Sequence, residues 1–153
     1  MPSFLCDTSI LVAAFCGWHE RHRESAAEIE TRLDQEDDMV VATHTLAELY
    51  SVLTRLPAPH RLSPRDALDL LEANLRACRA VALNERDYWK VLERGPGSGL
   101  TGGIVYDALI AQAASKAIVA EILTLNPRHF RRLELEGVEV TEPPAPRDGR
   151  TLS

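Results

Sequence analysis

Near its start the chain reads Ser3-Phe4-Leu5-Cys6-Asp7-Thr8-Ser9, an apolar run that stops at a carboxylate. The run has the length of a buried strand, and the polar residues after it are typical helix caps. An apolar helix start follows at 10–15, and Gly17 breaks that helix. The stretch therefore predicts a strand that passes directly into a helix, with Asp7 at the junction.

The same alternation of strand and helix continues along the chain. Short apolar runs predict four more strands, at 39–42, 80–83, 120–125 and 138–140. Helical spacing and capping residues predict helices at 19–33, from 43 or 45 to 56, and at 64–75, 84–92, 104–116 and 127–133, with a flexible glycine-rich connection at 95–99. This order is typical of an α/β fold, here a single domain with a mostly parallel central sheet flanked by helices.

Length and composition agree with one folded domain. The 153 residues are 45% apolar and 26% charged, and we expect a domain at 1–141 and a disordered, proline-rich tail at 142–153. No apolar run approaches the ~18 residues that cross a bilayer, and the N-terminus lacks the basic segment of a signal peptide. We therefore expect a cytoplasmic protein without a membrane segment, whose three cysteines are reduced.

The charge balance weighs only slightly against nucleic-acid binding. The formal net charge is −6, whereas phosphate backbones favour cationic surfaces. Bound divalent ions would offset part of this charge, and 15 of the 17 basic residues are Arg, which suits bidentate phosphate contacts. A GC-rich genome explains the same Arg bias, so composition alone leaves nucleic-acid binding open.

Three acidic residues stand at the predicted junctions of strands and helices. Asp7 directly follows the first strand, Glu48 lies just after the second, and Asp107 lies near the start of the helix at 104–116. Ligands of parallel sheets bind beyond the carboxyl ends of the strands, so one fold can bring the three acids together. Converging carboxylates without basic partners raise each other's pKa unless a cation neutralises them.

Each acid also has a simpler explanation when it is taken alone. Asp7 has the position of a helix cap, and Glu48 completes a capping-box pattern at 45–48. Asp107 falls inside the apolar stripe of its helix, where a salt bridge to an Arg is the alternative to a metal. Three unrelated caps at one sheet edge are a poor explanation, so the set predicts a site for Mg²⁺ or Mn²⁺ that hydrolyses a phosphodiester.

Four segments then resemble the motifs of PIN-domain ribonucleases. They are Phe4 to Ser9, Thr45 to Tyr50, Gly103 to Ala111 and Ile122 to Phe130, in the family's order and spacing. The compact single-domain form looks most like the VapC-type toxins of type II toxin–antitoxin pairs. The resemblance implies a parallel sheet flanked by helices, Mg²⁺- or Mn²⁺-dependent endoribonuclease activity on RNA, a homodimer, and inhibition by a small VapB-like antitoxin.

Carried over residue by residue, the resemblance implies catalytic roles for Asp7, Glu48, Asp107 and Asn126, the first three as metal ligands. The fourth position is often Asp in the family, and the amide of Asn126 adds no charge there. One metal position is therefore expected, and a second stays open. Candidates for supporting roles are the hydroxyl residues Thr8, Ser9 and Thr124 and the histidines His44 and His129.

Two other interpretations account for the same acids. A metal-poor relative would hold RNA or a protein partner without cleaving, which Asn126 and the net charge favour. A phosphotransfer receiver also gathers acids at a sheet edge, but it pairs an acidic doublet after the first strand with a late Lys. Asp7 stands alone and Lys116 lies in mid-helix, so the receiver fits poorly. In the toxin interpretation, residues 55–76 are candidate surface for the antitoxin or a second protomer.

Overall fold

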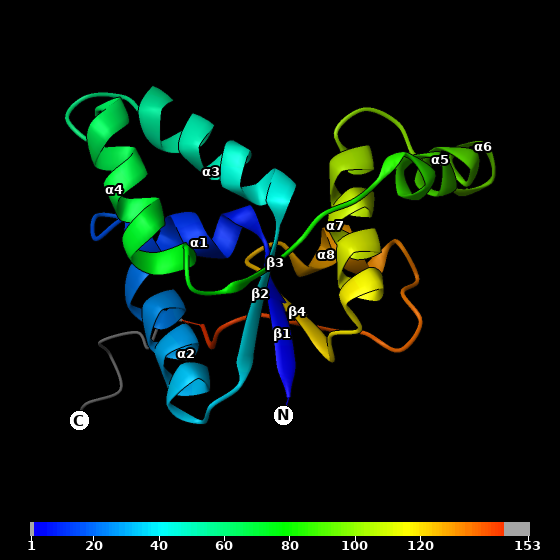
Figure 1. Cartoon of the computed structure of the whole chain (residues 1–153), viewed down its shortest axis with the longest axis horizontal. Coiled ribbons are helices and arrows are strands. Elements are labelled where there is room, and N and C mark those ends of the chain that lie inside the picture. Colours follow the sequence, from blue (N-terminus) through cyan, green and yellow to red (C-terminus); the bar gives the residue numbers. More distant parts are fainter. Residues whose placement is uncertain (1, 146–153) are drawn as a thin grey trace.

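The computed structural model describes residues 2–145, and within them a five-stranded sheet of order β3-β2-β1-β4-β5 forms the centre (Figure 1). Every pair of neighbouring strands is parallel. The strands are β1 (Ser3–Cys6), β2 (Asp38–Ala42), β3 (Arg79–Val81), β4 (Glu121–Leu123) and β5 (Glu139–Thr141). The predicted α/β class with a parallel central sheet is confirmed.

Helices lie on both sides of this sheet (Figure 1). One side carries α1 (Thr8–Phe15), α2 (His22–Asp34), α3 (Thr43–Arg55) and α4 (Pro64–Leu75). The other side carries α5 (Glu85–Glu93), α6 (Gly95–Ser98), α7 (Ile104–Ala117) and α8 (Pro127–Arg131). The predicted flanking helices are therefore confirmed. Each helix belongs to a segment of the chain that connects one strand of the sheet to the next in sequence.

Alternate residues of the central strands separate the core into two layers. Phe4 and Cys6 of β1 pack with Leu49 of α3 on one face. Leu5, between them, packs with Ile110 of α7 on the other face. A parallel sheet covered on both faces needs apolar residues at consecutive positions, which explains the unbroken apolar run of β1.

Capping side chains set two helix starts as the sequence predicts. Ser63 Oγ accepts a hydrogen bond from the Asp66 N–H at 3.1 Å, which fixes the start of α4. Asn84 and Asp87 exchange side-chain and backbone hydrogen bonds in a capping box at the start of α5. Each satisfies N–H groups that the first helical turn leaves without a partner.

Two local predictions are wrong. The segment 95–99 is not a flexible connection, because 95–98 form the short helix α6. The capping box at 45–48 is absent, because α3 begins at Thr43 directly after β2. Glu48 consequently lies in the second turn of α3 rather than at its cap, so capping does not explain this acid.

Residues 146–153 of the predicted tail lie outside the described part of the chain. Within the described part, Pro143 is buried, and the Arg21 guanidinium donates hydrogen bonds to the carbonyl oxygens of Pro143 and Pro144, both at 3.2 Å. These contacts hold the segment after β5 beside the start of α2. None of the helices in residues 2–145 has the length and apolar character needed to cross a membrane.

The end of α7 generates a stability prediction. Ile118 follows the helix in a left-handed conformation, φ 55° and ψ 48°, with 87% of its surface exposed. This conformation strains a β-branched residue but not Gly. Ile118→Gly is therefore expected to raise the free energy of unfolding by about 0.5–1 kcal/mol, after subtracting the greater flexibility of Gly in the unfolded chain. Urea denaturation measures the change.

Ser115→Gly is the matched control, because Ser115 is exposed and lies three residues earlier inside α7. Gly is a poor helix former, so this variant is expected to lose about 0.5 kcal/mol. A loss of stability in both variants would show that Ile118 is not strained.

Candidate active site

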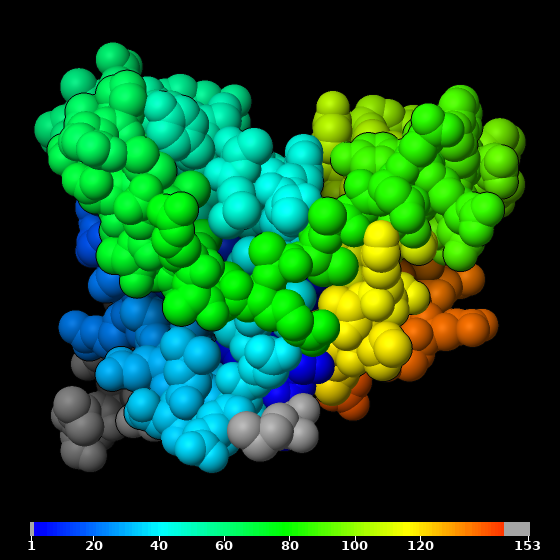
Figure 2. All heavy atoms as spheres, in the orientation of Figure 1, coloured from blue at the N-terminus to red at the C-terminus, as the bar shows by residue number. Residues whose placement is uncertain are grey.

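The carboxyl ends of β1, β2 and β4 meet at one edge of the sheet. Figure 2 shows a hollow in the molecular surface above this edge, between α3 and α4 on one side and α5 to α7 on the other. The strand order reverses at β1, because β2 and β3 lie on one side of it and β4 and β5 on the other. Ligand sites of open α/β sheets lie at such reversal points.

Asp7 is held at the end of β1 by hydroxyl and amide donors. Its Oδ1 accepts hydrogen bonds from the Ser9 hydroxyl at 2.7 Å and from the Ile10 N–H at 3.2 Å, so it also caps α1. Its Oδ2 accepts a hydrogen bond from the Thr124 hydroxyl, just after β4, at 2.6 Å. Asp7 is 6% exposed. Both carboxylate oxygens are therefore fixed in direction by neutral groups.

The electrostatic surroundings of Asp7 disfavour its negative charge. Burial raises the pKa of the Asp7 carboxyl, although hydrogen bonds from Thr124, Ser9 and Ile10 act to lower it. The negative charge of Asp107 raises the pKa of Asp7 further. A buried carboxylate of this kind is stable when a cation lies nearby, because hydrogen bonds alone replace only part of its hydration.

Asp107 lies in the first turn of α7 and links the acids together. Its side chain is 27% exposed, and its Oδ2 lies 3.4 Å from His129 Nδ1 of α8. Burial raises the pKa of the Asp107 carboxyl; the neighbouring His129 and Arg132 act to lower it, while the charge of Glu48 raises it. The pKa of Asp107 therefore depends on an acid of α3 as well as on basic residues in and after α8.

Glu48 is the most exposed of the three acids. Its side chain is 41% exposed, and its Oε2 lies 3.2 Å from His44 Nε2, one turn earlier on α3. Glu48 on α3 and Asp107 on α7 nevertheless lie near enough for the charge of Glu48 to act on the Asp107 carboxyl.

The structure thus places the three predicted acids at one sheet edge, from β1, α3 and α7. Their charges act on each other in two pairs, Asp7 with Asp107 and Asp107 with Glu48. Within residues 2–145, however, no three His, Cys, Asp or Glu side chains lie close enough to hold a metal ion by themselves. The donor set still fits Mg²⁺ or Mn²⁺, because these hard ions take carboxylate oxygens and usually keep several waters.

Asn126 is linked to Asp7 through Thr124. The Asn126 N–H donates a hydrogen bond to Thr124 Oγ1 at 2.9 Å, and Thr124 in turn donates to Asp7. Asn126 is exposed, and its side chain does not cap α8. The main chain of the residue at the fourth predicted position is therefore two hydrogen bonds away from the buried acid.

The hydroxyl pair of Ser9 and Thr124 is more central than the sequence indicates. Their oxygens lie 3.3 Å apart, and Ser9 Oγ also accepts a hydrogen bond from the Leu125 N–H at 3.1 Å. The pair joins the ends of β1 and β4. This contact is compatible with the predicted sheet, but no local sequence pattern predicts it. Thr8 is buried as well, but it caps nothing and makes no side-chain hydrogen bond to Asp7.

Basic side chains border the acids on the side of α8. Four exposed residues, Arg128, His129, Arg131 and Arg132, lie in this helix or directly after it. Arg132 is near enough to Asp107 to act on its pKa. The acidic centre therefore has a basic rim although the chain is acidic as a whole. The sequence signal for this rim was the segment 128–132, in which every residue except Phe130 is basic. Only the fold shows that two of these residues, His129 and Arg132, lie near Asp107.

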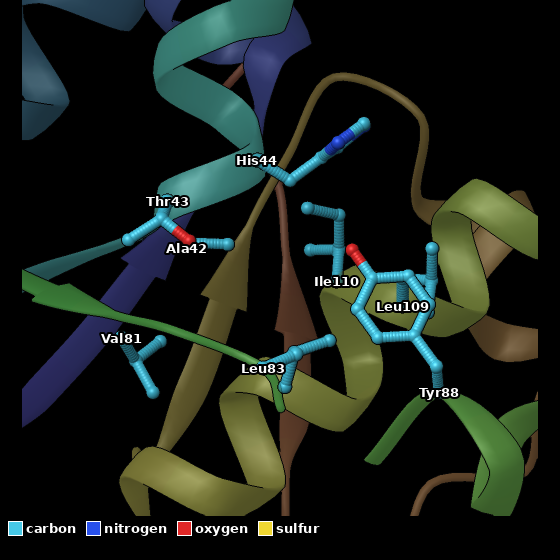
Figure 3. A pocket seen from close by; sticks show the side chains of 8 residues that line it. All are labelled: Ala42, Thr43, His44, Val81, Leu83, Tyr88, Leu109 and Ile110. Atoms are coloured by element: carbon cyan, nitrogen blue, oxygen red, sulfur yellow. The ribbon is translucent and has the colours of Figure 1, made fainter. Parts of the chain in front are cut away.

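A small pocket lies at the start of α3, next to His44 (Figure 3). It holds about 10 Å³, which is close to the room for one water molecule. It is lined by Ala42, Thr43, His44, Val81, Leu83, Tyr88, Leu109 and Ile110. The pocket is therefore a gap at the start of α3 that is too small for a substrate.

Comparison with known proteins gives consistent matches over almost the whole chain. The model of the PIN domain family matches residues 4–135. The chain is 36% identical to Ribonuclease VapC40 of Mycobacterium tuberculosis over 134 residues, which cover 88% of this chain and 94% of that protein. It is 35% identical to Ribonuclease VapC27 of the same organism over 140 residues, covering 91% and 96%.

Solved structures show the same likeness in three dimensions. The crystal structure of VapBC2 from Rickettsia felis, bound to a DNA fragment from its promoter, contains a chain that matches with a TM-score of 0.66. The match covers 92% of this chain and 98% of the other at 18% identity. At that identity the likeness shows a shared fold.

The raised pKa of Asp7 predicts that the metal-free protein loses stability as pH rises. When the folded-state pKa of an acid lies above its unfolded value, the folded protein keeps the proton to higher pH. The resulting stabilisation is complete below the unfolded pKa and is lost as pH rises through the folded pKa. Asp7→Asn removes this titration, so it is expected to lose less stability than the wild type as pH rises above the ordinary Asp pKa of about 4. Urea denaturation in EDTA measures both profiles.

Asp69→Asn serves as the control, because the Asp69 side chain on α4 is 62% exposed and distant from the sheet edge in the fold. This variant is expected to follow the wild-type profile. Identical profiles for the wild type and Asp7→Asn would mean that burial does not perturb Asp7.

Proposed function

Because the chain belongs to the PIN-domain family, we propose that it is a metal-dependent endoribonuclease and the toxin of a type II toxin–antitoxin pair. The observation that carries the proposal is the buried Asp7 carboxylate at the strand reversal. Its hydrogen-bond donors are neutral, the negative charge of Asp107 acts on it, and no cationic side chain of residues 2–145 forms an ion pair with it. The ribonuclease names of two relatives, which match nearly the full chain, support the same substrate class.

Asp7, Asp107 and Glu48 are the proposed ligands of Mg²⁺ or Mn²⁺. Such an ion, when bound, lowers the pKa of a bound water and stabilises charge on the phosphodiester. Ser9 and Thr124 orient the two oxygens of Asp7, so this carboxylate does not have to be reordered when the site is filled. The proposed role of Asn126 is to orient water or substrate with its amide group.

The basic rim at α8 supplies the proposed contacts to RNA phosphates. Arg side chains bind phosphate oxygens in pairs, and they keep their charge at all relevant pH values. Arg132 is the first candidate, because it already acts on Asp107. Local positive charge of this kind allows an acidic protein to hold a polyanion close to its carboxylates.

We further propose a VapB-like antitoxin protein as the inhibitor, a homodimer as the assembly, and the cytoplasm as the place of action. These three proposals rest on membership of the family. The alternative is a catalytically weak module that binds RNA or a protein. Asn126, which brings no charge to the fourth position, is the observation that favours this alternative.

Substitution of the buried acids tests the catalytic proposal. Asp7→Asn and Asp107→Asn are each expected to slow RNA cleavage by about 100-fold or more, the loss seen when a group that stabilises the transition state is removed. The rate is measured on labelled RNA with Mg²⁺ or Mn²⁺, and circular dichroism checks that both variants are folded. Asp69→Asn is expected to cleave like the wild type. Full cleavage by either of the first two variants would exclude that residue from the site.

Metal removal tests the cofactor. EDTA is expected to abolish cleavage, and excess Mg²⁺ or Mn²⁺ is expected to restore it, because the proposed mechanism relies on the metal to activate water and to stabilise charge on the phosphodiester. Calorimetry with Mn²⁺ gives the affinity. Asn126→Asp adds a carboxylate near the site and is expected to tighten Mn²⁺ binding roughly tenfold. A folded wild type that binds no Mn²⁺ at millimolar concentration would support the binding-module alternative instead.

A further inference from the structure

Two aromatic rings meet above the acids, one from each helical layer. His44 lies in the first turn of α3 and Tyr106 in the first turn of α7. The ring centroids are 5.8 Å apart, and the ring planes are within 2° of parallel. Because α3 and α7 cover opposite faces of the sheet (Figure 1), this ring pair bridges the two layers at the hollow.

One ring contacts a proposed metal ligand, and the other belongs to the residue next to one in the chain. His44 Nε2 lies 3.2 Å from Glu48 Oε2. Tyr106 directly precedes Asp107 on α7. A group that stacks on this ring pair would therefore lie beside the carboxylates rather than at a distant surface.

The ring pair leaves aromatic surface open. Tyr106 is 54% exposed, and the His44 side chain is 33% exposed. Parallel rings at this centroid distance are offset, so part of each face has no partner. Tyr106 thus contributes little to the core, and packing does not explain why a large aromatic residue occupies this position.

We infer that the His44–Tyr106 pair is a stacking subsite for one nucleobase of single-stranded RNA. The inference rests on the proposed endoribonuclease function and names a substrate contact for it. An RNA nucleotide offers a flat base for the rings and a phosphate for the basic rim, so both parts of this surface find a partner in one ligand. Stacking accepts every base, so the subsite positions the strand without selecting a sequence.

A pair of RNA ligands tests the subsite in EDTA, where binding is measured without cleavage. One is a labelled single strand of about 12 nucleotides, and the other has the same backbone with every base replaced by an abasic ribose. Tyr106→Ala is expected to weaken binding of the first RNA about 5- to 100-fold and to leave binding of the abasic RNA unchanged. Fluorescence anisotropy measures both affinities, and the comparison does not depend on the register of the RNA.

Tyr106→Phe keeps the ring and is expected to bind both RNAs like the wild type. Trp18→Ala is the matched control, because Trp18 is 45% exposed and also stacks on a histidine, His60, with ring centroids 4.4 Å apart. It lies in the connection between α1 and α2 and is expected to change neither affinity. Thermal melting checks that all variants are folded.

Equal losses on both RNAs would mean that Tyr106 acts only through the structure, and the inference would be wrong. Unchanged binding of both RNAs by Tyr106→Ala would also overturn it and would leave the pair as a tie between α3 and α7 or a contact for a protein. Failure of the cleavage assays, with a base-dependent effect of Tyr106, would instead overturn the proposed function and keep the subsite.

Discussion

The site depends on one buried arrangement, the Asp7 carboxylate between the hydroxyls of Ser9 and Thr124. These hydrogen bonds join the end of β1 to the end of β4 at the point where the strand order reverses. They make a negative charge possible in a place where burial opposes it. The neighbouring side chains modify this negative charge. Asp107 and Glu48 add to it, and the basic rim at α8 partly balances it.

The balance of charges is the physical basis for the divalent ion proposed at this edge. Hydrogen bonds to a carboxylate compensate only part of the hydration lost on burial. A second and a third carboxylate make the deficit larger. A salt bridge to Asp7 would remove the deficit permanently, but it would also occupy the oxygens that a metal needs. The hydroxyl donors therefore orient Asp7 while its charge remains available to an exchangeable ligand.

The sequence predicted the parallel sheet, most helices and the edge at which the acids meet, because these depend on patterns over a few residues. Asp7 and Asp107 were found for this reason, as were the caps at Ser63 and Asn84. The capping box proposed for Glu48 is absent because α3 begins at Thr43, and local propensity does not decide between helix starts at Thr43 and Thr45. Contacts between distant segments, such as Ser9 with Thr124 and His44 with Tyr106, have no local signature. They became visible only when the layers were assembled.

The Asp7–Thr124 bond joins residues 117 positions apart, and this separation has a consequence in time. Contacts between distant segments form late, because the chain between them must first lose its freedom. During synthesis β4 leaves the ribosome long after β1, so the acids cannot be arranged until most of the chain exists. A nascent or truncated chain therefore lacks the assembled acids. If the proposed nuclease activity depends on them, each new molecule passes through an interval before it becomes competent, in which another protein can bind it first.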